Sequence, residues 1–351
     1  YGIEPFIGEC KKSVWKYLHE WEKMSDQVGY WVDMEHPYVT YHNDYIESEW
    51  WSLKQIYDKG MLYLGHKIAP YCPRCGTALS SHEVAQGYKN VKEISAIVRF
   101  KVKGQENTSL LAWTTTPWTI PGNYAISVNP DFDYVLLQAP NGEVYILAEG
   151  LVESVCKAAG LDQDSCTVLA TFKGSDFELM TAKHPLFDRE SVILCGDHVT
   201  LDAGTGCVHT APGFGADDYI TCKRYGMDMV VPVDDQGKHT AYAGKYEGMT
   251  TDASNPVILQ DMKDNGSLFA SEDIIHSYPH CWRCKQPIIF RATPQWFCSV
   301  DSFKDEAIAA CEDVRWVPSW GKDRMRSMIL ERTDWCISRQ RRWGLPIPVL
   351  Y

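Results

Sequence analysis

Two Cys-x-x-Cys pairs carry the clearest chemical signal in the sequence. They are Cys72-Pro-Arg-Cys75 and Cys281-Trp-Arg-Cys284, and about two hundred residues separate them. Two thiolates on a tight turn can bind one metal ion, and a second pair completes a tetrahedral zinc site with no open position, which indicates a structural ion. The alternatives are two unrelated surface turns, a redox pair, or a site in which a histidine replaces a cysteine. The neighbouring histidines are His66, His276 and His280.

The second signal is the glycine-rich segment Gly204–Asp218, GTGCVHTAPGFGADD. It lacks the third glycine of a dinucleotide-binding fingerprint and follows only a weak strand pattern, so we discount that function. Cys207 and His209 lie two positions apart on an expected strand and therefore share a face, which would suit a thiol–imidazole pair. A buried cysteine beside a structural histidine is commoner. Asp217 and Asp218 are expected to open a helix, where the helix dipole alone favours carboxylates.

The third signal is the segment WTTTPWTIPGN, which begins at Trp113. Pro117 disfavours the helical conformation at Thr116, so Thr114 and Thr116 are expected to face one way and Thr115 the other. Threonine is neither an acid nor a base at neutral pH. These hydroxyls can therefore position water or an ester but cannot drive proton transfer unaided, and by residue type alone they are ordinary strand threonines.

The elements that must hold these residues change along the chain. The first ninety residues have helical periodicity, with one helix expected from Ile7 through Trp21 and another from Asp44 to Gly60. From Ile94 onward the period becomes that of strands, and Asn141-Gly142 indicates a hairpin. The other expected strands are 110–114, 124–128, 134–138, 144–148, 167–172, 192–195, 207–210 and 229–233. The other expected helices are 149–159, 217–225, 255–265, 301–311 and 320–332. Short strands with scattered helices favour a mixed α/β fold with a barrel-like sheet over a doubly wound one.

Composition narrows the class of protein. The 351 residues are 45% hydrophobic and 23% charged, which is ordinary for a globular chain and excludes disorder. No run approaches the roughly 18 apolar residues of a membrane span, and the N-terminal residues do not resemble a signal peptide. A net charge of −12 restricts any nucleic-acid contact to a local patch. Thirteen cysteines without an export signal indicate a reducing, cytoplasmic location.

Together the three segments resemble the editing insertion, connective polypeptide 1, of isoleucyl-tRNA synthetases. The resemblance covers essentially the whole chain, from YGIEPFIGECKKSVW through TTTPWTIPGN and GTGCVHTAPGFGADDY to DWCISRQRRWGLPIP. In the related leucyl and valyl enzymes the threonine motif resembles Thr-Thr-Arg-Pro. This chain has Thr114-Thr115-Thr116-Pro117 at that place. We expect the eukaryotic cytosolic type. The ATP-binding signatures HIGH and KMSKS and the anticodon-binding region are absent, so we expect a fragment that makes no aminoacyl-adenylate.

The resemblance implies hydrolysis of valyl-tRNA(Ile) at a site remote from synthesis. Asp218 would hold the α-ammonium group of the substrate, and Thr114, Thr115 and Thr116 would surround the terminal ribose and the attacking water. The small side-chain pocket would be walled by Trp118, His209 and Tyr278. No function of the family can be matched to Cys207.

The fold that the resemblance implies is mixed α/β, with a barrel-like editing core, flanking helices and zinc-knuckle connectors. Its expected divisions are a helical connective segment (1–91), the editing domain (92–275) and a returning segment with a basic tail (276–351). Structural zinc is the one expected cofactor, with ATP and Mg used only by the full-length enzyme. The expected partners are the valine-carrying 3′ end of tRNA(Ile) and the catalytic core of the synthetase, without a membrane.

Two other functions remain open from the residues. A zinc-stapled module that docks tRNA without hydrolysing it would suit the basic tail, Arg339 to Arg342. A thiol hydrolase that uses Cys207 and His209 would be inactivated by alkylating reagents.

Overall fold

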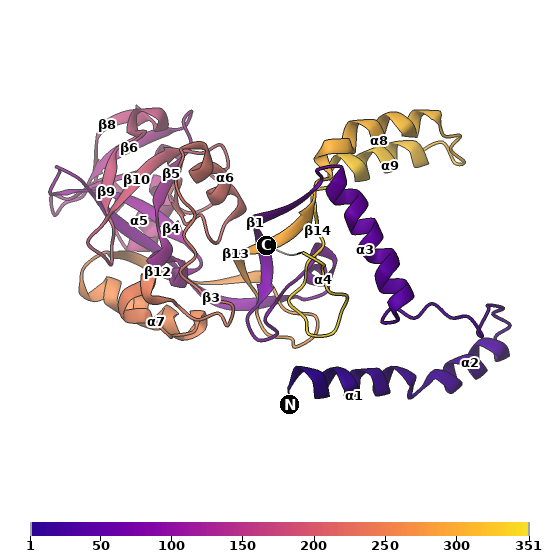
Figure 1. The fold of residues 1–351 in the computed structure, drawn as a ribbon. Coiled ribbons are helices and arrows are strands. Elements are labelled where there is room, and N and C mark those ends of the chain that lie inside the picture. The colour runs from indigo at the N-terminus through magenta and orange to yellow at the C-terminus, as the bar shows by residue number, and fades with distance from the viewer. Residues whose placement is uncertain (1, 350–351) are drawn as a thin grey trace. The chain divides into compact units, whose positions relative to one another are not determined.

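The computed structural model describes residues 2–349, which divide into two compact units (Figure 1). Unit 2 is Lys67–Thr293, and unit 1 combines the residues up to His66 with those from Pro294 onward. The chain passes between the units twice, in strands β1 (Leu62–Cys72) and β13 (Ile289–Cys298). The expected three-part division at 1–91, 92–275 and 276–351 stays a prediction, because compactness separates only these two units.

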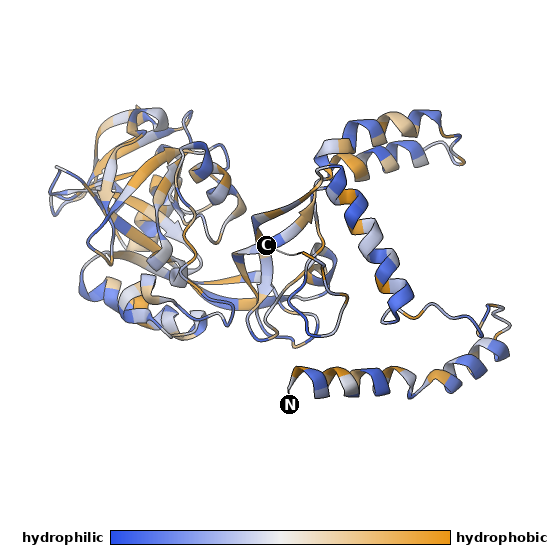
Figure 2. Cartoon of the chain, in the orientation of Figure 1, coloured by the Kyte–Doolittle hydropathy of each residue, from blue (hydrophilic) through white to orange (hydrophobic). Residues whose placement is uncertain are grey.

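Unit 1 is mostly helical. Its elements are α1 (Ile3–Trp15), α2 (Leu18–Gln27), α3 (Asn43–Asp58), the 3₁₀ turns η6 (Asp301–Phe303) and η7 (Cys311–Asp313), α8 (Lys304–Ala310), α9 (Gly321–Leu330) and β14 (Trp335–Cys336). The helix expected from Ile7 through Trp21 is interrupted, because Tyr17 has a ψ of 14° and starts a second helix. Hydrophobic and hydrophilic residues mix along α1 and α2 (Figure 2), and neither helix buries a residue. Among the described residues, no helix has the length and apolarity to cross a membrane.

Unit 2 holds most of the strands. They are β2 (Thr77–Ala78), β3 (Tyr88–Val102), β4 (Thr108–Thr114), β5 (Ala125–Val128), β6 (Asp133–Gln138), β7 (Val144–Ala148), β8 (Thr167–Lys173), β9 (Thr181–Lys183), β10 (Glu190–Cys195), β11 (Cys207–Thr210) and β12 (Leu268–Pro279). Its helices are α4 (Ser81–Ala85), α5 (Val152–Ala159), α6 (Ala216–Arg224) and α7 (Thr251–Asp264), with 3₁₀ turns η1 (Pro117–Gly122), η2 (Glu149–Leu151), η3 (Gln163–Ser165), η4 (Gly174–Phe177) and η5 (Ala241–Tyr246). The expected mixed α/β fold is confirmed.

The strands of unit 2 other than β2 form a ten-stranded sheet of order β12-β3-β9-β10-β5-β11-β4-β7-β6-β8. An additional β3–β4 pairing, from Ala96 opposite Thr114 to Lys101 opposite Ser109, joins two strands that this order separates. The pairs β3–β9, β9–β10, β10–β5, β5–β11, β11–β4 and β4–β3 therefore form a closed ring. A second sheet has the order β14-β13-β1-β2.

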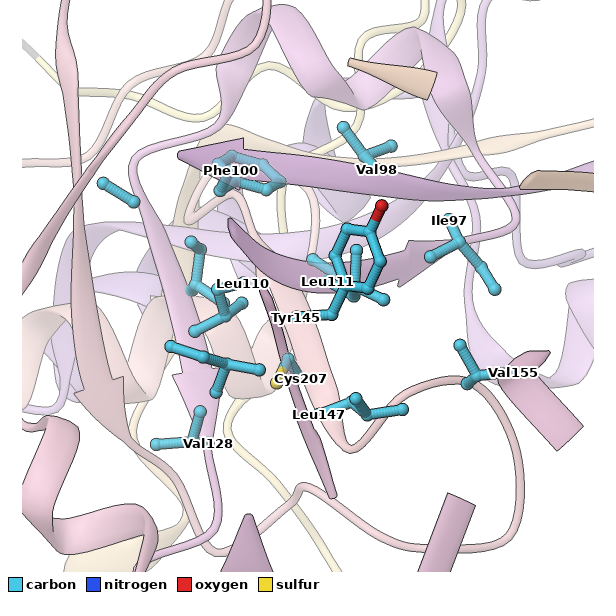
Figure 3. Close-up of a cluster of buried hydrophobic side chains, with 14 of the residues drawn as sticks. Ile97, Val98, Phe100, Leu110, Leu111, Val128, Tyr145, Leu147, Val155 and Cys207 are labelled. Carbon is cyan, nitrogen blue, oxygen red and sulfur yellow. The ribbon is translucent and has the colours of Figure 1, made fainter. Parts of the chain in front are cut away.

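The hydrophobic core of unit 2 lies among these strands. Figure 3 shows Phe100, Leu110, Val128 and Leu147 in this cluster, together with the sulfur of Cys207. Consecutive residues of β3 and β4 belong to this cluster, 96–98 in β3 and 110–112 in β4, so both faces of these strands are covered. This packing holds the end of β4, where the threonine segment begins, and β11, which lies within the glycine-rich segment.

Two expectations from the sequence are wrong, and one long strand was missed. The first ninety residues are not all helical, because β1 begins at Leu62 and β3 at Tyr88. Residues 229–233 form no strand, and Val233 makes only an isolated bridge with His239. The long strand β12 was not predicted from the sequence; it lies at the edge of the sheet and most of its residues are exposed or half-buried.

Candidate functional site

One cavity of unit 2 brings together all the residues expected to bind or hydrolyse the substrate. It has a volume of about 410 Å³. Its lining includes Thr114, Thr115, Thr116, Trp118, His209, Asp218 and Tyr278, together with Trp113, Thr119, Val208, Ala211, Phe214, Gly215 and Phe290. The end of β4, the turn η1, strand β11, the first turn of α6 and strand β12 supply these side chains. Residues more than one hundred and fifty positions apart thus share one concave surface.

The three threonines are not equivalent. The hydroxyl oxygen of Thr114 accepts the backbone N–H of Thr116 at 3.1 Å and lies 3.4 Å from the Thr116 hydroxyl. The Thr116 hydroxyl also lies 3.2 Å from that of Thr119. Thr115 makes no hydrogen bond through its side chain to any residue between 2 and 349. Its hydroxyl is consequently the one that a bound ester or water could use without breaking a contact.

His209 is held by both of its ring nitrogens. Nδ1 lies 2.7 Å from the side-chain nitrogen of Asn123, and Nε2 lies 3.0 Å from the Thr119 hydroxyl. The same Asn123 nitrogen donates to the carbonyl of Ala125, which identifies it as the amide NH₂. Nδ1 therefore accepts and Nε2–H donates to the Thr119 hydroxyl, which in turn donates a hydrogen bond to the Thr116 carbonyl at 2.7 Å.

This network makes His209 a fixed neutral group. The residue is buried, and burial lowers the pKa of its imidazole to about 3. Because both nitrogens already have protein partners, the ring has neither a free proton acceptor nor freedom to turn. His209 can therefore act as a rigid wall of the cavity, and it is poorly suited to proton transfer.

Asp218 is the carboxylate of the cavity. Its Oδ2 accepts the backbone N–H of Ala211 at 2.8 Å, which ties the first turn of α6 to the end of the glycine-rich segment. Burial raises the pKa of its carboxyl group to about 6, although the Ala211 hydrogen bond acts in the opposite direction. Asp217, by contrast, is exposed and does not line the cavity. A half-desolvated carboxylate at pH 7 favours a cationic ligand.

Aromatic rings form the opposite wall. Trp118 packs edge-on against Phe214, with ring centroids 4.8 Å apart, and its backbone N–H donates to Asn255 Oδ1 at 2.8 Å. The Tyr278 hydroxyl donates to the Ile288 carbonyl at 2.9 Å. These contacts hold two aromatic faces in place, and they leave the wall apolar beside the polar threonines.

A second candidate site lies at the four cysteines. The Sγ atoms of Cys72, Cys75, Cys281 and Cys284 all lie within 4.8 Å of one another. Cys72 and Cys284 are 3.5 Å apart, and Cys75 and Cys281 are 4.0 Å apart. Zinc–sulfur bonds of about 2.3 Å in a tetrahedron place sulfur atoms about 3.8 Å apart. The thiols therefore fit a tetrahedral ion, and the group includes none of the histidines considered as substitutes.

Both cysteine turns have the same backbone. The N–H of Gly76 donates to the Cys72 carbonyl at 2.9 Å, and that of Lys285 donates to the Cys281 carbonyl at 2.8 Å. Each donor has a positive φ, 62° at Gly76 and 61° at Lys285. The first turn uses glycine for this conformation, whereas the second holds a lysine in a conformation that L-residues disfavour. The chain maintains the turn despite this cost.

Comparison with known families identifies the chain. The family model described as tRNA synthetases class I (I, L, M and V) matches residues 1–351. The chain belongs to this family.

Three curated relatives of this synthetase chain are isoleucine–tRNA ligases. Those of Clostridium tetani and Clostridium novyi are each 47% identical over 99% of the chain, and that of Caldicellulosiruptor bescii is 43% identical over 99%. The aligned region is 34%, 34% and 38% of these ligases, respectively. The synthetase chain thus spans about a third of the length of the curated relatives it matches. All three are bacterial, and the expected eukaryotic cytosolic type stays a prediction.

Solved structures offer more distant likenesses. The editing domain of the P. knowlesi cytosolic leucyl-tRNA synthetase has a TM-score of 0.39 at 15% identity, covering 55% of this chain and 99% of that one. The P. falciparum counterpart has a TM-score of 0.40 at 12% identity, covering 52% and 99%. Likeness at this level carries no weight for the chemistry of the synthetase cavity.

Sequence reasoning missed three polar residues of the synthetase site. Asn123 and Thr119 orient His209, and Asn255 holds the backbone of Trp118. Asn123 and Thr119 lie inside the threonine segment. Asn123 directly follows a run of buried residues, and a buried asparagine needs hydrogen-bond partners, so its position could have indicated a partner such as His209. Asn255 lies on α7, and nothing in the sequence connects it to the threonines.

The synthetase structure gives no support to a thiol–imidazole pair. Cys207 lies in the apolar core with Val128 and Leu147 (Figure 3), and burial raises the pKa of its thiol. A buried neutral thiol is inert, since the thiolate is the nucleophile. His209 has its two partners elsewhere, in Asn123 and Thr119.

Proposed function

We propose that unit 2 hydrolyses the ester bond of mischarged valyl-tRNA(Ile), as the editing domain of an isoleucine–tRNA ligase. The observation that carries this proposal is one cavity lined by both Asp218 and the Thr114–Thr116 segment. An aminoacyl ester presents an ammonium group beside an acyl carbon and a ribose. A carboxylate and the uncommitted hydroxyl of Thr115 in one cavity could bind the ammonium group and the ester of such a substrate.

In this mechanism Asp218 would bind the α-ammonium group through a charge-assisted hydrogen bond. That contact orients the acyl carbon toward Thr115, whose hydroxyl makes no contact with other described side chains. An ester is already activated, so a positioned water can attack it without a protein nucleophile. Hydroxyl groups and the neighbouring ribose hydroxyl then stabilise the developing oxyanion.

Selection of valine over isoleucine would work by exclusion. One additional methylene favours the larger side chain by about 0.8 kcal/mol in an apolar pocket, which is the wrong direction for editing. Forcing that methylene against a rigid wall costs about 1–3 kcal/mol and reverses the preference. His209, fixed at both nitrogens, would be this wall, with Trp118 and Tyr278 forming the rest of the pocket.

The four thiols would hold one structural zinc ion, through Cys72, Cys75, Cys281 and Cys284. Their separations fit a tetrahedral ion, and four sulfur ligands leave no position for substrate. Zinc bound there would join the outgoing and returning strands of the chain, and no catalytic step passes through it. The closed ring of six strand pairings would be the barrel-like editing core.

The proposed partners follow from this function. They are the 3′ end of tRNA(Ile) carrying valine and the catalytic core of the full-length synthetase, which alone would use ATP and Mg. The bacterial relatives support this proposal, because they are isoleucine–tRNA ligases and the aligned region is only 34% of their length. A cytoplasmic location, with no membrane contact, is the proposed setting.

A deacylation assay tests the proposal. Purified chain should release valine from valyl-tRNA(Ile) and leave isoleucyl-tRNA(Ile) intact. Binding of tRNA without release of valine would favour the docking module, for which the cationic segment Arg339–Arg342 is the supporting observation. Loss of activity on alkylation of the wild-type chain, together with an inactive Cys207→Ser variant, would favour the thiol hydrolase.

A further inference from the structure

A second cavity of unit 2 is lined by an excess of cations. Its volume is about 340 Å³, and none of its lining residues lines the first cavity. Three lining side chains are cations, Arg99, Lys101 and Lys183, and one is a carboxylate, Glu143. The rest of the lining is His184, Pro185, Asn265, Gly266 and Ser267. A cationic cavity is notable in a chain whose net charge is −12, because acidic residues are in the majority.

Two paired strands bring the lysines of this cavity together. In the second half of β3, Phe100 and Val102 are buried in the core, so Lys101 between them is exposed on the outer face. The register partner of Lys101 on β9 is Lys183, which is also exposed. Side chains directly opposite each other have Cβ atoms about 4.5–5.5 Å apart, and like charges placed there are destabilising. An anion between the two ammonium groups would remove this repulsion.

No carboxylate of the described chain neutralises these two lysines. Glu190 is the register partner of Lys183 on β10, yet its carboxylate pairs with Lys103, just beyond the end of β3. Among residues 2–349, neither Lys101 nor Lys183 forms an ion pair. Their neighbours on the same surface are thus paired, whereas the two lysines that face the cavity are left with their charge.

The other side chains of the cavity favour a phosphate group over a nucleobase. The Arg99 guanidinium pairs with Glu143 at 3.1 Å and covers the rings of Tyr145 and Phe269, 5.4 and 5.1 Å from their centroids. The one ring among the described lining residues is that of His184, which is buried and whose pKa burial lowers to about 3. The cavity therefore offers ammonium groups without an open stacking surface, and such groups contact the backbone of a nucleic acid.

We propose that Lys101 and Lys183 together bind a backbone phosphate of tRNA, outside its 3′ end. This inference rests on the proposed function, which makes tRNA the partner. A phosphate between the two ammonium groups accepts charge-assisted hydrogen bonds from both. The contact is also joined to the candidate site, because His184 follows Lys183 and its Nε2 hydrogen-bonds to the Ile120 carbonyl of η1 at 3.0 Å.

Salt-dependent binding of a truncated tRNA tests this contact. Fluorescence anisotropy would measure binding of the full 351-residue chain to tRNA(Ile) that lacks its single-stranded 3′ end, over a series of salt concentrations. Because each phosphate contact releases counterions, the double variant Lys101→Gln/Lys183→Gln should reduce the magnitude of the slope of log K against log salt by about 1. Its affinity at low salt should fall about fivefold.

Lys103 and Lys173 provide a matched double control. Lys103 pairs with Glu190 and Lys173 with Asp133, and neither lysine lines the cavity. Lys103→Gln/Lys173→Gln removes the same charge from the chain and should leave the salt slope unchanged, with the melting temperature measured for both double variants. Equal slopes for the two double variants, or no binding of the truncated tRNA, would overturn the inference.

Inorganic phosphate distinguishes the source of the phosphate group. At millimolar concentration and constant ionic strength it should leave the melting temperature of the wild-type chain unchanged. A rise in melting temperature that Lys101→Gln/Lys183→Gln loses would indicate a site for free phosphate and would overturn the assignment to tRNA. Lysine-dependent binding of truncated tRNA by a chain that releases no valine would instead overturn only the proposed hydrolysis.

Discussion

At the scale of single residues, burial acts on the two titratable groups of the cavity in opposite chemical directions. It raises the pKa of Asp218 to about 6 and lowers that of His209 to about 3. Asp218 is thus still ionised at pH 7, whereas His209 is neutral and, in the proposed function, would act only through its shape. The resemblance to the synthetase family predicted which side chains meet, whereas residue types and spacing alone favoured structural roles. The environment of His209 depends on Asn123 and Thr119, and those hydrogen bonds require the folded chain.

Asp218→Ala should abolish hydrolysis of valyl-tRNA(Ile) while the fold persists. Loss of the counter-charge for the ammonium group should lower kcat/KM about a hundredfold or more. Asp217→Ala is the matched control, because Asp217 is exposed and outside the cavity, and its kcat/KM should stay within about twofold. Circular dichroism would verify folding. An inactive Asp217 variant beside an active Asp218 variant would show that the register is wrong.

The pH dependence of hydrolysis should report Asp218. Since only the ionised carboxylate binds the ammonium group, kcat/KM should rise with pH and level off above an apparent pKa of about 6. Asp218→Asn should have low activity that no longer follows this curve. The same shift affects stability: the native state binds more protons than the unfolded state between about pH 4 and 6, so stability falls as pH rises through that window. A flat wild-type profile would contradict the assignment.

His209→Ala should change selectivity more than rate. Without the imidazole wall, valyl-tRNA(Ile) hydrolysis should stay within about an order of magnitude, and hydrolysis of cognate isoleucyl-tRNA(Ile) should begin. His239→Ala serves as the control, because His239 is also a buried histidine with a lowered pKa but lines neither cavity. Loss of both activities would make His209 a catalytic group, and unchanged selectivity would make it purely structural.

At the scale of elements, two glycines of the glycine-rich segment allow its backbone to lie close to neighbouring parts of the site. A Cβ at Gly213 would lie 2.2 Å from the Val230 carbonyl oxygen, and one at Gly215 would lie 2.6 Å from Cγ of Asp218. Periodicity located most strands and helices correctly, because alternation follows burial on one face. It failed for β12 at the sheet edge and for 229–233, where an apolar run packs without strand pairing.

Gly215→Ala should damage function without unfolding the chain. The backbone at Gly215 has a φ of −119°, which alanine adopts freely, so the added methyl group acts only by displacing the Asp218 side chain. Valyl-tRNA hydrolysis should fall at least about tenfold, with the melting temperature nearly unchanged. Gly213→Ala should instead lower the melting temperature, because its methyl group meets a backbone carbonyl that cannot rotate away. Equal melting temperatures for the two variants would contradict this distinction.

At the scale of the whole molecule, one cluster of thiols brings together two turns that lie far apart in the sequence. Cys75 and Cys281 are 206 positions apart, and all the residues of both cavities lie between or beside the two cysteine turns. The Cys-x-x-Cys spacing predicted that these four thiols would gather, because it reflects local turn geometry. How the second turn reaches the first depends on the pairing of distant strands, which no local pattern encodes.

Metal removal should therefore lower stability before it affects chemistry. Freshly purified, reduced protein should contain one zinc per chain, and a zinc chelator should lower the melting temperature by more than about 5 °C. Hydrolysis of valyl-tRNA well below that temperature should persist, since four sulfur ligands exclude substrate. Cys72→Ser should reproduce the loss of stability, whereas Cys166→Ser, a half-buried cysteine outside the cluster, should not. Absence of zinc, or a metal bound beside His209, would refute a structural ion at these thiols.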